Sequence, residues 1–473
     1  MNKLLIASIL CCFVVQTAHA EETSTQKLSE YSLKKAVELR ESALKENSAW
    51  SIVESITTEV GARSGGSEGD ALAVAWAEAK FKALGFDKIT LEPVTFPSWK
   101  RGVETAYIKS PFKQNLVITA LGNSISTPVN GLEAEIIQFD SINDLKAADP
   151  KLVKNKIVFI SFKMQRFRDG RGYRPAVGGR SAGAVEASKK GALAVIIRSV
   201  GTDSNRVAHT GNMSYEEGVK KIPAAALSNP DADLILNMLQ RKQPVVINMT
   251  LGSKTGEDYT SYTVVGEITG SKYPKEYVLI GAHLDSWDLG TGAIDDGAGV
   301  AIVMAAGELI KRMPEAPKRS IKVVLFANEE QGLFGGKEFA KAHKDELQNY
   351  IVGAESDFGA GKIWKFSTKF KESSLIVADQ IHQVLAPLGI ERGNNKAGGG
   401  PDIIHSRMAG MAVVNLSQDG TDYFDYHHTS NDTLDKIDPD SLTQNVAAYV
   451  SFAWLMSELE GNVGFFPAEK NLD

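Results

Sequence analysis

Cysteine is almost absent from this chain of 473 residues, and its absence narrows the chemistry. The only two cysteines, Cys11 and Cys12, lie side by side near the N-terminus. The chain beyond them has no thiol, so it can form no disulfide and offers a metal no thiolate ligand. At this length it holds enough apolar residues to build one large core or two smaller ones without disulfides.

Long apolar runs and basic blocks are missing as well. No segment after residue 20 reaches the roughly 18 uninterrupted apolar residues expected of a membrane helix. The formal net charge is −6, and lysine and arginine do not gather in any block. This composition predicts a globular protein and argues against a nucleic-acid partner.

The first twenty residues have the layout of a secretory signal peptide. Met1-Asn2-Lys3 is a short positive start, Leu4 to Val15 is an apolar run, and Ala18-His19-Ala20 has the small-x-small form that signal peptidase cuts. The residue before Cys11 is Leu10 rather than a small residue, which argues against the rival hypothesis of a lipoprotein anchor. We expect cleavage after Ala20, a secreted or periplasmic mature protein, and no membrane association after cleavage.

The spacing of apolar residues predicts an α/β protein with an insertion. Helical spacing at 69–84 leads into a strand-like run at 89–94, and buried-strand runs at 278–282 and 321–326 flank a predicted helix at 297–312. Strand, helix and strand in this order are typical of a mostly parallel sheet, whose ligands gather at the carboxyl ends of its strands. Residues 124–253 show a different pattern, in which short predicted strands and helices follow one another, and this pattern indicates a compact inserted domain.

Histidine and acidic residues follow the predicted strands. His283 ends one strand, and Asp285 stands two residues further on. A histidine there can give one ring nitrogen to a metal while a carboxylate accepts the N–H of the other. Asp295 and Asp296 open the next helix. A helix cap explains one of these acids, but two adjacent carboxylates are costly to crowd unless a cation neutralises them.

The same pattern recurs twice further along the chain. Glu329 and Glu330 follow the strand at 321–326, where one acid could bind a metal while its neighbour acts as a general base. Asp357 follows another strand, and His427 and His428 precede the last long helix. Taken singly, each group could be a set of solvated side chains. Their joint placement predicts a zinc site with nitrogen and oxygen ligands and an open position for water.

These motifs together resemble the family of zinc exopeptidases that includes bacterial leucyl aminopeptidases and glutamate carboxypeptidase. The likeness extends from about Trp50 to the C-terminal helix and rests on four runs: His283-Leu284-Asp285-Ser286-Trp287-Asp288, Ala293-Ile294-Asp295-Asp296-Gly297, Glu329-Glu330-Gln331-Gly332 and Glu355-Ser356-Asp357. Lys221-Ile222-Pro223-Ala224 resembles part of a protease-associated domain.

The resemblance implies a fold and a domain order. The fold would be a mixed, mostly parallel central sheet flanked by helices, with an inserted protease-associated domain. The four parts would be a signal peptide (residues 1–20), the N-terminal part of the catalytic domain (21–123), the inserted domain (124–253) and the C-terminal part of the catalytic domain (254–473).

The resemblance also implies two zinc ions per chain, held by five side chains. One ion would bind His283 and Asp357, the second would bind Glu330 and His428, and Asp295 would bridge the two.

Further residues receive roles from the same resemblance. Glu329 would be the general base that takes a proton from water, and Asp285 would orient His283. His428 fits the family pattern, a histidine followed by a hydroxyl residue and later by an acid and threonine, whereas His427 does not. The peptide bond between Asp295 and Asp296 would be cis.

The implied function is hydrolysis of dipeptides or short peptides by a metallo-exopeptidase. The family contains both aminopeptidases and carboxypeptidases, so the end of the peptide that is cut stays open. Two other hypotheses are a zinc glutaminyl cyclase and a binding protein without catalysis. The full ligand set and the inserted segment favour a peptidase. The inserted segment could cap the cleft or form the contact of a homodimer.

Overall fold

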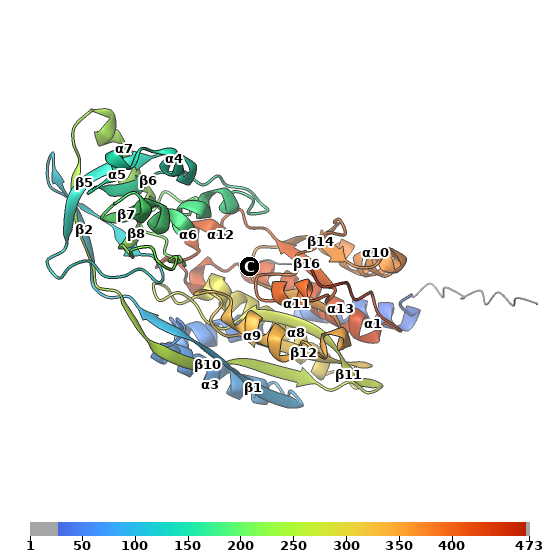
Figure 1. The fold of residues 1–473 in the computed structure, drawn as a ribbon. Helices are drawn as coiled ribbons and strands as arrows, with labels where there is room; N and C mark the ends of the chain where they lie inside the picture. Colours follow the sequence, from blue (N-terminus) through green and yellow to red (C-terminus); the bar gives the residue numbers. More distant parts are fainter. Residues whose placement is uncertain (1–26, 470–473) are drawn as a thin grey trace, which may run out of the picture.

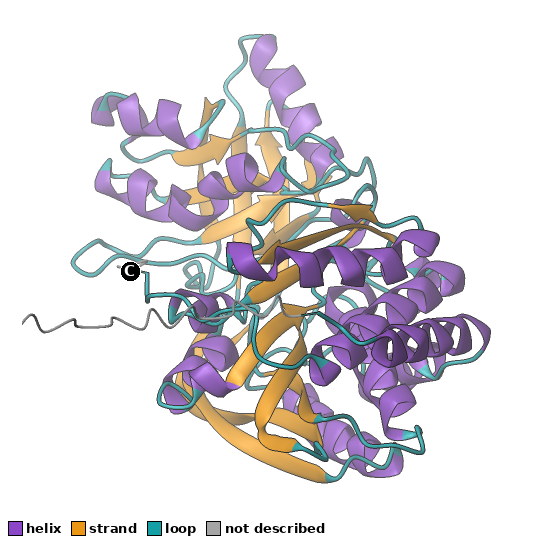
Figure 2. Ribbon diagram, turned by 90° about the vertical axis from the view of Figure 1, so that its right-hand side faces the viewer, coloured by secondary structure: helices purple, strands orange, loops and turns teal. Residues whose placement is uncertain are grey.

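Two eight-stranded sheets form the framework of the protein in a computed structural model, which describes residues 27–469 (Figure 1). The expected signal peptide lies outside the described residues. Among the helices of residues 27–469, none has both the length and the apolar character needed to cross a membrane. Figure 2 shows strands of both sheets running through the molecule, with helices on the outside.

The first sheet, here called the main sheet, has the strand order β1-β10-β12-β11-β13-β16-β14-β15. Its strands are β1 (Lys88–Lys100), β10 (Lys254–Ile268), β11 (Tyr273–His283), β12 (Arg319–Phe326), β13 (Tyr350–Glu355), β14 (Ile363–Lys369), β15 (Glu391–Arg392) and β16 (Val413–Gln418). The four central strands β12, β11, β13 and β16 are parallel, as are β14 and β15. Antiparallel pairing joins β1 to β10, β10 to β12, and β14 to β16. The expectation of a mixed α/β fold is therefore confirmed, with the parallel character strongest at the centre.

Alternating side chains bury both faces of the main sheet. On β11, Val278 and Ile280 pack into the core that includes helices α8 and α13, whereas Leu279 packs into a separate cluster with Phe339 of α9. This alternation follows from the two-residue period of a strand. The helices around this sheet are α1 (Glu30–Lys45), α2 (Ala49–Ser55), α3 (Glu68–Ala83), α8 (Ala298–Lys311), α9 (Phe334–Ala342), α10 (Leu375–Leu385), α11 (Ile404–Met408) and α13 (Pro439–Glu458).

The second sheet is built entirely from the chain between β1 and β10, with the order β3-β2-β9-β5-β6-β7-β8-β4. Its strands are β2 (Glu104–Ser110), β3 (Gln114–Leu116), β4 (Ile118–Ala120), β5 (Leu132–Phe139), β6 (Ile157–Ile160), β7 (Ala194–Arg198), β8 (Ala224–Leu227) and β9 (Val246–Leu251). Helices α4 (Ile142–Ala147), α5 (Pro150–Val153), α6 (Tyr173–Lys189) and α7 (Asn229–Gln240) accompany it. In Figure 1 the paired strands β1 and β10 lead from the main sheet toward this second sheet. Its strands begin before residue 124, because β2 to β4 pair with later strands of the same sheet.

The register of the parallel strands determines where their carboxyl ends lie. Gly281 of β11 is aligned with Val324 of β12 on one side and with Glu355 of β13 on the other. All three strands therefore end at one edge of the main sheet, within a few residues of one another. This edge is where side chains that follow the strands can meet.

Candidate metal centre

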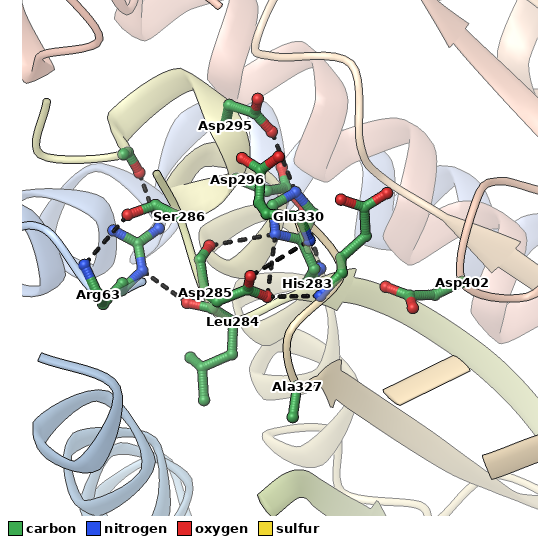
Figure 3. Close-up of polar contacts among 12 residues, drawn as sticks. Arg63, His283, Leu284, Asp285, Ser286, Asp295, Asp296, Ala327, Glu330 and Asp402 are labelled. Carbon is green, nitrogen blue, oxygen red and sulfur yellow. Dashed lines mark hydrogen bonds and ion pairs between the residues drawn. The ribbon is translucent and has the colours of Figure 1, made fainter. Parts of the chain in front are cut away.

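Three neighbouring strands end in the predicted site residues. β11 ends at His283, β12 is followed by Glu329 and Glu330, and β13 is followed by Asp357. Figure 3 shows His283, Asp295 and Glu330 converging on one region from separate segments of chain. His283 and Glu330 are buried, and Glu329 is half-buried at the rim.

A short turn, η2 (Ala293–Gly297), brings Asp295 to the same place. The peptide bond between Asp295 and Asp296 is cis, which confirms the prediction. The buried carboxylate of Asp432 accepts hydrogen bonds from the backbone N–H groups of Ile294 at 2.6 Å and Asp295 at 3.3 Å. Asp296 is occupied differently, since its carboxylate accepts from the N–H groups of Gly299 and His283. Both acids of the turn therefore lie near other site residues, Asp295 with His428 and Glu330 and Asp296 with Asp357, and both are close to His283.

Asp295 stands between the two groups of predicted ligands. One carboxylate oxygen, Oδ1, lies 3.0 Å from Nε2 of His283, and the other, Oδ2, lies 3.2 Å from Nε2 of His428. His283 Nε2 is 3.5 Å from Oδ1 of Asp357, and His428 Nε2 is 2.9 Å from Oε2 of Glu330. The fold thus brings all five predicted ligands together, with the two oxygens of Asp295 facing two different histidines.

His427 and His428 both reach this region, and their surroundings differ. Their rings stack with centroids 3.4 Å apart, and His427 Nε2 lies 3.7 Å from Asp295 Oδ2. Within residues 27–469, Nδ1 of His427 has no hydrogen-bond partner, whereas Nδ1 of His428 faces the carbonyl oxygen of Thr210 at 3.3 Å. Because a carbonyl can only accept, this contact places the proton on Nδ1 and leaves Nε2 of His428 free to bind a metal.

The segment that contacts His428 belongs to the second sheet's part of the chain. The Thr210 N–H donates to the carbonyl of His428 at 3.0 Å. In the preceding residue, His209, the ring nitrogen Nδ1 lies 2.8 Å from the carbonyl oxygen of His427. His209 is buried, and its Nε2 lies 2.7 Å from Oδ1 of Asp203. The inserted segment is therefore bonded directly to the loop that carries a predicted ligand.

Asp285 makes a contact that its spacing does not predict. The ring of His283 faces the backbone carbonyl of Asp285, at 3.1 Å from Nδ1, whereas the nearer carboxylate oxygen is 3.6 Å away. The carboxylate instead accepts hydrogen bonds from the backbone N–H groups of Glu329 at 2.9 Å and Glu330 at 3.3 Å. Asp285 thereby holds both glutamates as well as the neighbouring histidine.

A fully buried arginine supports the chain on either side of these residues. Arg63 donates to the backbone carbonyls of Leu284 at 2.6 Å and of Thr291 and Gly292 at 2.8 Å each. Ser286, which Figure 3 places next to Arg63, accepts the Arg63 N–H. Nothing in the sequence indicates this role for Arg63, because its partners lie more than 200 residues away.

The histidines and carboxylates of the site shift one another's pKa values. Burial alone would lower the pKa of His283, but Asp357, Asp285 and Asp295 hold this pKa well above its ordinary value. Burial would raise the pKa of Asp295, yet His283 and His428 keep it well below the usual range. Burial, together with neighbouring carboxylates, raises the pKa values of Glu329 and Glu330 well above normal.

Acids just outside this group show the same excess of negative charge. Burial and the charge of Asp357 raise the pKa of Glu355 to about 8, and burial and Asp295 raise that of Asp432 to about 7. Many buried carboxylates at one place cannot all ionise at low cost unless a cation is added.

The residues fit a metal by their donor atoms. Oδ2 of Asp295 and Oε1 of Glu330 are buried and accept no hydrogen bond from the residues that the structure describes. Among the described residues, three groups have donor atoms within 4.8 Å of one another. They are His283, Asp295 and Glu330; Asp295, His427 and His428; and His283, Asp296 and Asp357. Imidazole nitrogens and carboxylate oxygens without thiolates are ligands that suit zinc.

A cavity of about 350 Å³ opens onto these residues. Glu329, Asp295 and His428 are among the residues that line it. The inserted part of the chain supplies Tyr173, Arg180 and Asn212 to the same lining. Sequence reasoning missed these three residues, because no local pattern distinguishes them from surface side chains.

Comparison with known proteins places the chain in a family. Residues 263–453 match the family model described as Peptidase family M28. The chain is 36% identical over 401 residues to carboxypeptidase Q of Bos taurus, covering 85% of this chain and 83% of that protein, and equally identical to carboxypeptidase Q of Homo sapiens over the same length.

Solved structures agree with this placement. A peptidase M28 precursor from Shewanella amazonensis SB2B is 53% identical with a TM-score of 0.91, covering 93% of this chain and 100% of that one. A zinc aminopeptidase from Bacillus subtilis, at 18% identity and a TM-score of 0.60 over 89% of this chain and 98% of its own, shares the fold. On the strength of the long, high-identity matches, this chain belongs to peptidase family M28 and is a metallo-exopeptidase.

Proposed function

We propose that this chain is an exported exopeptidase that binds two zinc ions and hydrolyses dipeptides or short peptides. The observation that carries the proposal is the position of Asp295, whose two carboxylate oxygens face His283 and His428 separately. His283 with Asp357, and His428 with Glu330, would then hold one ion each. When bound, two zinc ions would lower the pKa of a water molecule and polarise the scissile carbonyl.

The protein's own side chains would move the protons. Glu329 is half-buried at the cavity, where its carboxylate can accept a proton from the attacking water and return it to the leaving amine. Asp285 acts as a positioning residue, because it holds the backbone of Glu329 and Glu330. His428 offers Nε2 because the Thr210 carbonyl keeps the proton on Nδ1.

Replacing Glu329 by Gln tests the assignment of the base. We expect zinc content to stay at two ions per chain, measured by plasma mass spectrometry, while kcat falls about 10²- to 10⁴-fold. The matched control is Glu338→Gln, which removes a half-buried carboxylate of α9 whose ionic partner among the described residues is Lys341. Near-normal turnover by Glu329→Gln with zinc retained would contradict the role.

The second sheet is proposed to be the inserted protease-associated domain. Strand pairing supports a start near residue 101 rather than 124, since β2 to β4 pair within this sheet, and an end at 253, since β10 begins at Lys254. Hydrogen exchange tests this boundary. The amides of β2 should be protected together with those of β9, and joint protection with β1 instead would favour the later boundary.

Export is proposed from the N-terminal sequence. The mature chain should begin at Glu21, and N-terminal sequencing of protein recovered from outside the cytoplasm would test this. A mature protein that still carries residues 1–20 would contradict it.

A further inference from the structure

An arginine stands where the chain passes from the main sheet to the second sheet. Arg101 follows the last residue of β1, shortly before β2 begins at Glu104. The chain returns beside it, since the N–H of Gly252 donates to the carbonyl of Val103 at 2.9 Å. Only 10% of the Arg101 side chain is exposed. This arginine therefore lies at the junction of the two sheets.

The guanidinium of Arg101 forms an ion pair with the loop that follows β11, residues 284–292. Its Nε and Nη2 donate to Oδ2 and Oδ1 of Asp288, each at 2.8 Å. Such a bidentate pair fixes the orientation of both groups as well as their distance. Burial alone would lower the pKa of Arg101, but Asp288 and Glu104 hold this pKa above its ordinary value. The loop that begins just after His283 is thus tied to the junction by opposite charges.

The other hydrogen bonds of the guanidinium reach the second sheet's part of the chain. Nη1 donates to Oγ1 of Thr119 and to the carbonyl of Ala120, both at 2.7 Å, and Nη2 donates to Oγ1 of Thr210 at 3.1 Å. The Thr210 hydroxyl donates in turn to the same Ala120 carbonyl at 2.8 Å. Thr210 is the residue whose carbonyl faces Nδ1 of His428. One guanidinium therefore joins the loop after His283 to the residue that orients His428.

Aromatic packing connects the same segments. Trp287, the neighbour of Asp288, belongs to the apolar cluster of the second sheet although it lies on the loop after β11. Its ring contacts those of Trp99 and His428, with centroids 6.2 Å and 5.7 Å away. A Cβ atom on Gly122 would lie only 2.2 Å from the Trp287 ring, so the second sheet fits closely against it.

Stability alone does not account for this arrangement. Removing two charges from water offsets most of their attraction, so such a pair adds little net stability. The fixed geometry is what a bidentate pair supplies. That geometry concerns the metal centre, because His283 and His428 face different oxygens of Asp295 and must keep their separation for Asp295 to contact both.

We infer that Arg101 is a positioning residue of the metal centre, which sets the distance between His283 and His428 through its bonds to Asp288 and Thr210. The inference rests on the proposed two-zinc function and adds a residue that, among the described residues, hydrogen-bonds no predicted ligand side chain.

The first test replaces Arg101 by Met, which removes every donor of the guanidinium. Competition with a chelator should show zinc binding weakened about 10- to 100-fold, the usual loss when a group that orients metal ligands is removed. Hydrogen exchange on the zinc-free protein gives a second readout. Exchange should accelerate in residues 207–213, which include the Thr210 N–H bonded to the carbonyl of His428, and not in β7. Equal acceleration throughout the second sheet would indicate a role in stability alone and would overturn the inference.

Arg319→Met is the matched control. Arg319 is 2% exposed and donates to Glu276 at 2.7 Å and to the carbonyl of Gly461 at 2.6 Å. It begins β12, whereas the predicted ligands follow the other end of that strand. Its loss should lower stability and leave both zinc affinity and the exchange of residues 207–213 close to wild type. Equal zinc affinities in the Arg101 and Arg319 variants would contradict the inference.

Asp288→Asn provides a test if Arg101→Met does not fold. This change keeps the bonds of Arg101 within the second sheet and removes only the charge on the loop after β11. Zinc binding should weaken about tenfold, and an unchanged affinity would refute the link. Where both variants fold, combining them should cost little more than Arg101→Met alone, because both break one connection; additive losses would contradict this.

The outcomes distinguish the inference from the proposed function. A wild-type protein that binds no zinc would refute the proposed function alone, because exchange in the zinc-free protein still tests Arg101. Two bound zinc ions, with the same affinity in the wild type and in Arg101→Met, would refute the inference alone.

Discussion

Replacing His209 by Leu should weaken zinc binding at a distance. His209 lies on the inserted segment and contacts no predicted ligand side chain, but its Nδ1 is 2.8 Å from the carbonyl of His427. The next residue, Thr210, bonds both the carbonyl and the ring of His428. Without the imidazole, the loop that carries His428 loses one of its ties to the second sheet.

The structure sets the expected size of the effect. Nε2 of His209 lies 2.7 Å from Oδ1 of the buried carboxylate of Asp203, so removing the ring takes away the nearest donor to this oxygen and leaves it the Asn229 amide at 3.2 Å. Breaking a buried pair by removing one member costs about 3–5 kcal/mol of folding free energy. Loss of groups that orient metal ligands typically weakens metal binding by about 10- to 100-fold. Both effects should appear together in His209→Leu.

Two assays distinguish a loss of ligand positioning, which lowers zinc affinity, from a general loss of folding stability. Zinc affinity is measured by competition with a chelator, and stability is measured by denaturant unfolding. The control is Asp231→Asn, which disturbs the second sheet by weakening bonds to Val117 N–H and Arg206 and touches nothing in the 424–428 loop. Equal losses of zinc affinity in both variants, or an unchanged affinity in His209→Leu, would refute the reasoning.

Three other changes have defined outcomes. Asp285→Asn should lower kcat about 10- to 100-fold, because asparagine cannot accept from both backbone N–H groups that the carboxylate holds. His428→Ala should lose zinc and activity, whereas His427→Ala should keep most of both. Asp70→Asn should alter the pH dependence of stability: burial raises the pKa of Asp70 from 3.8 to about 6, so the wild type should lose about 2 kcal/mol relative to this variant as pH rises from 4 to 7.

The sign of the last effect follows from proton binding. Well below its ordinary pKa of 3.8, the carboxyl of Asp70 is protonated in both states and contributes no difference. As pH rises toward 6, the Asp70 carboxyl ionises in the unfolded chain but stays mostly protonated in the folded protein. Folding therefore becomes less favourable. Thermal unfolding from pH 4 to 7 measures the difference, and parallel curves for the two proteins would contradict it. For the histidines, activity kept by His428→Ala and lost by His427→Ala would reverse the assignment. For Asp285→Asn, unchanged kcat and zinc content would remove its positioning role.

Local sequence patterns were enough to predict the set of candidate ligands. His283, the Glu329–Glu330 pair and Asp357 each follow a run of buried residues, and a parallel sheet places the ends of such runs at one edge. The cis bond after Asp295 and the mixed α/β fold were predicted from family motifs that are contiguous in the chain. These features depend on neighbouring residues and on strand periodicity, both of which a single sequence displays.

Other features depend on contacts between distant segments, which local patterns do not encode. β2 pairs with β9 across more than 130 residues, so the start of the inserted sheet could not be located from the local sequence pattern alone. The carboxylate of Asp285 reaches the backbone of Glu329 rather than the ring of His283, because the strand register brings that backbone closer.

Short motifs indicated the family, the expected compartment and the candidate metal ligands, because each motif is contiguous in the sequence. Which groups surround these residues depends on contacts that form only when the chain folds. Arg180 is a single arginine between small residues in the sequence, and only folding buries it in the cavity that Glu329 and His428 also line. His209 likewise gains its partner, the carbonyl of His427, only when residues 218 positions apart are brought together.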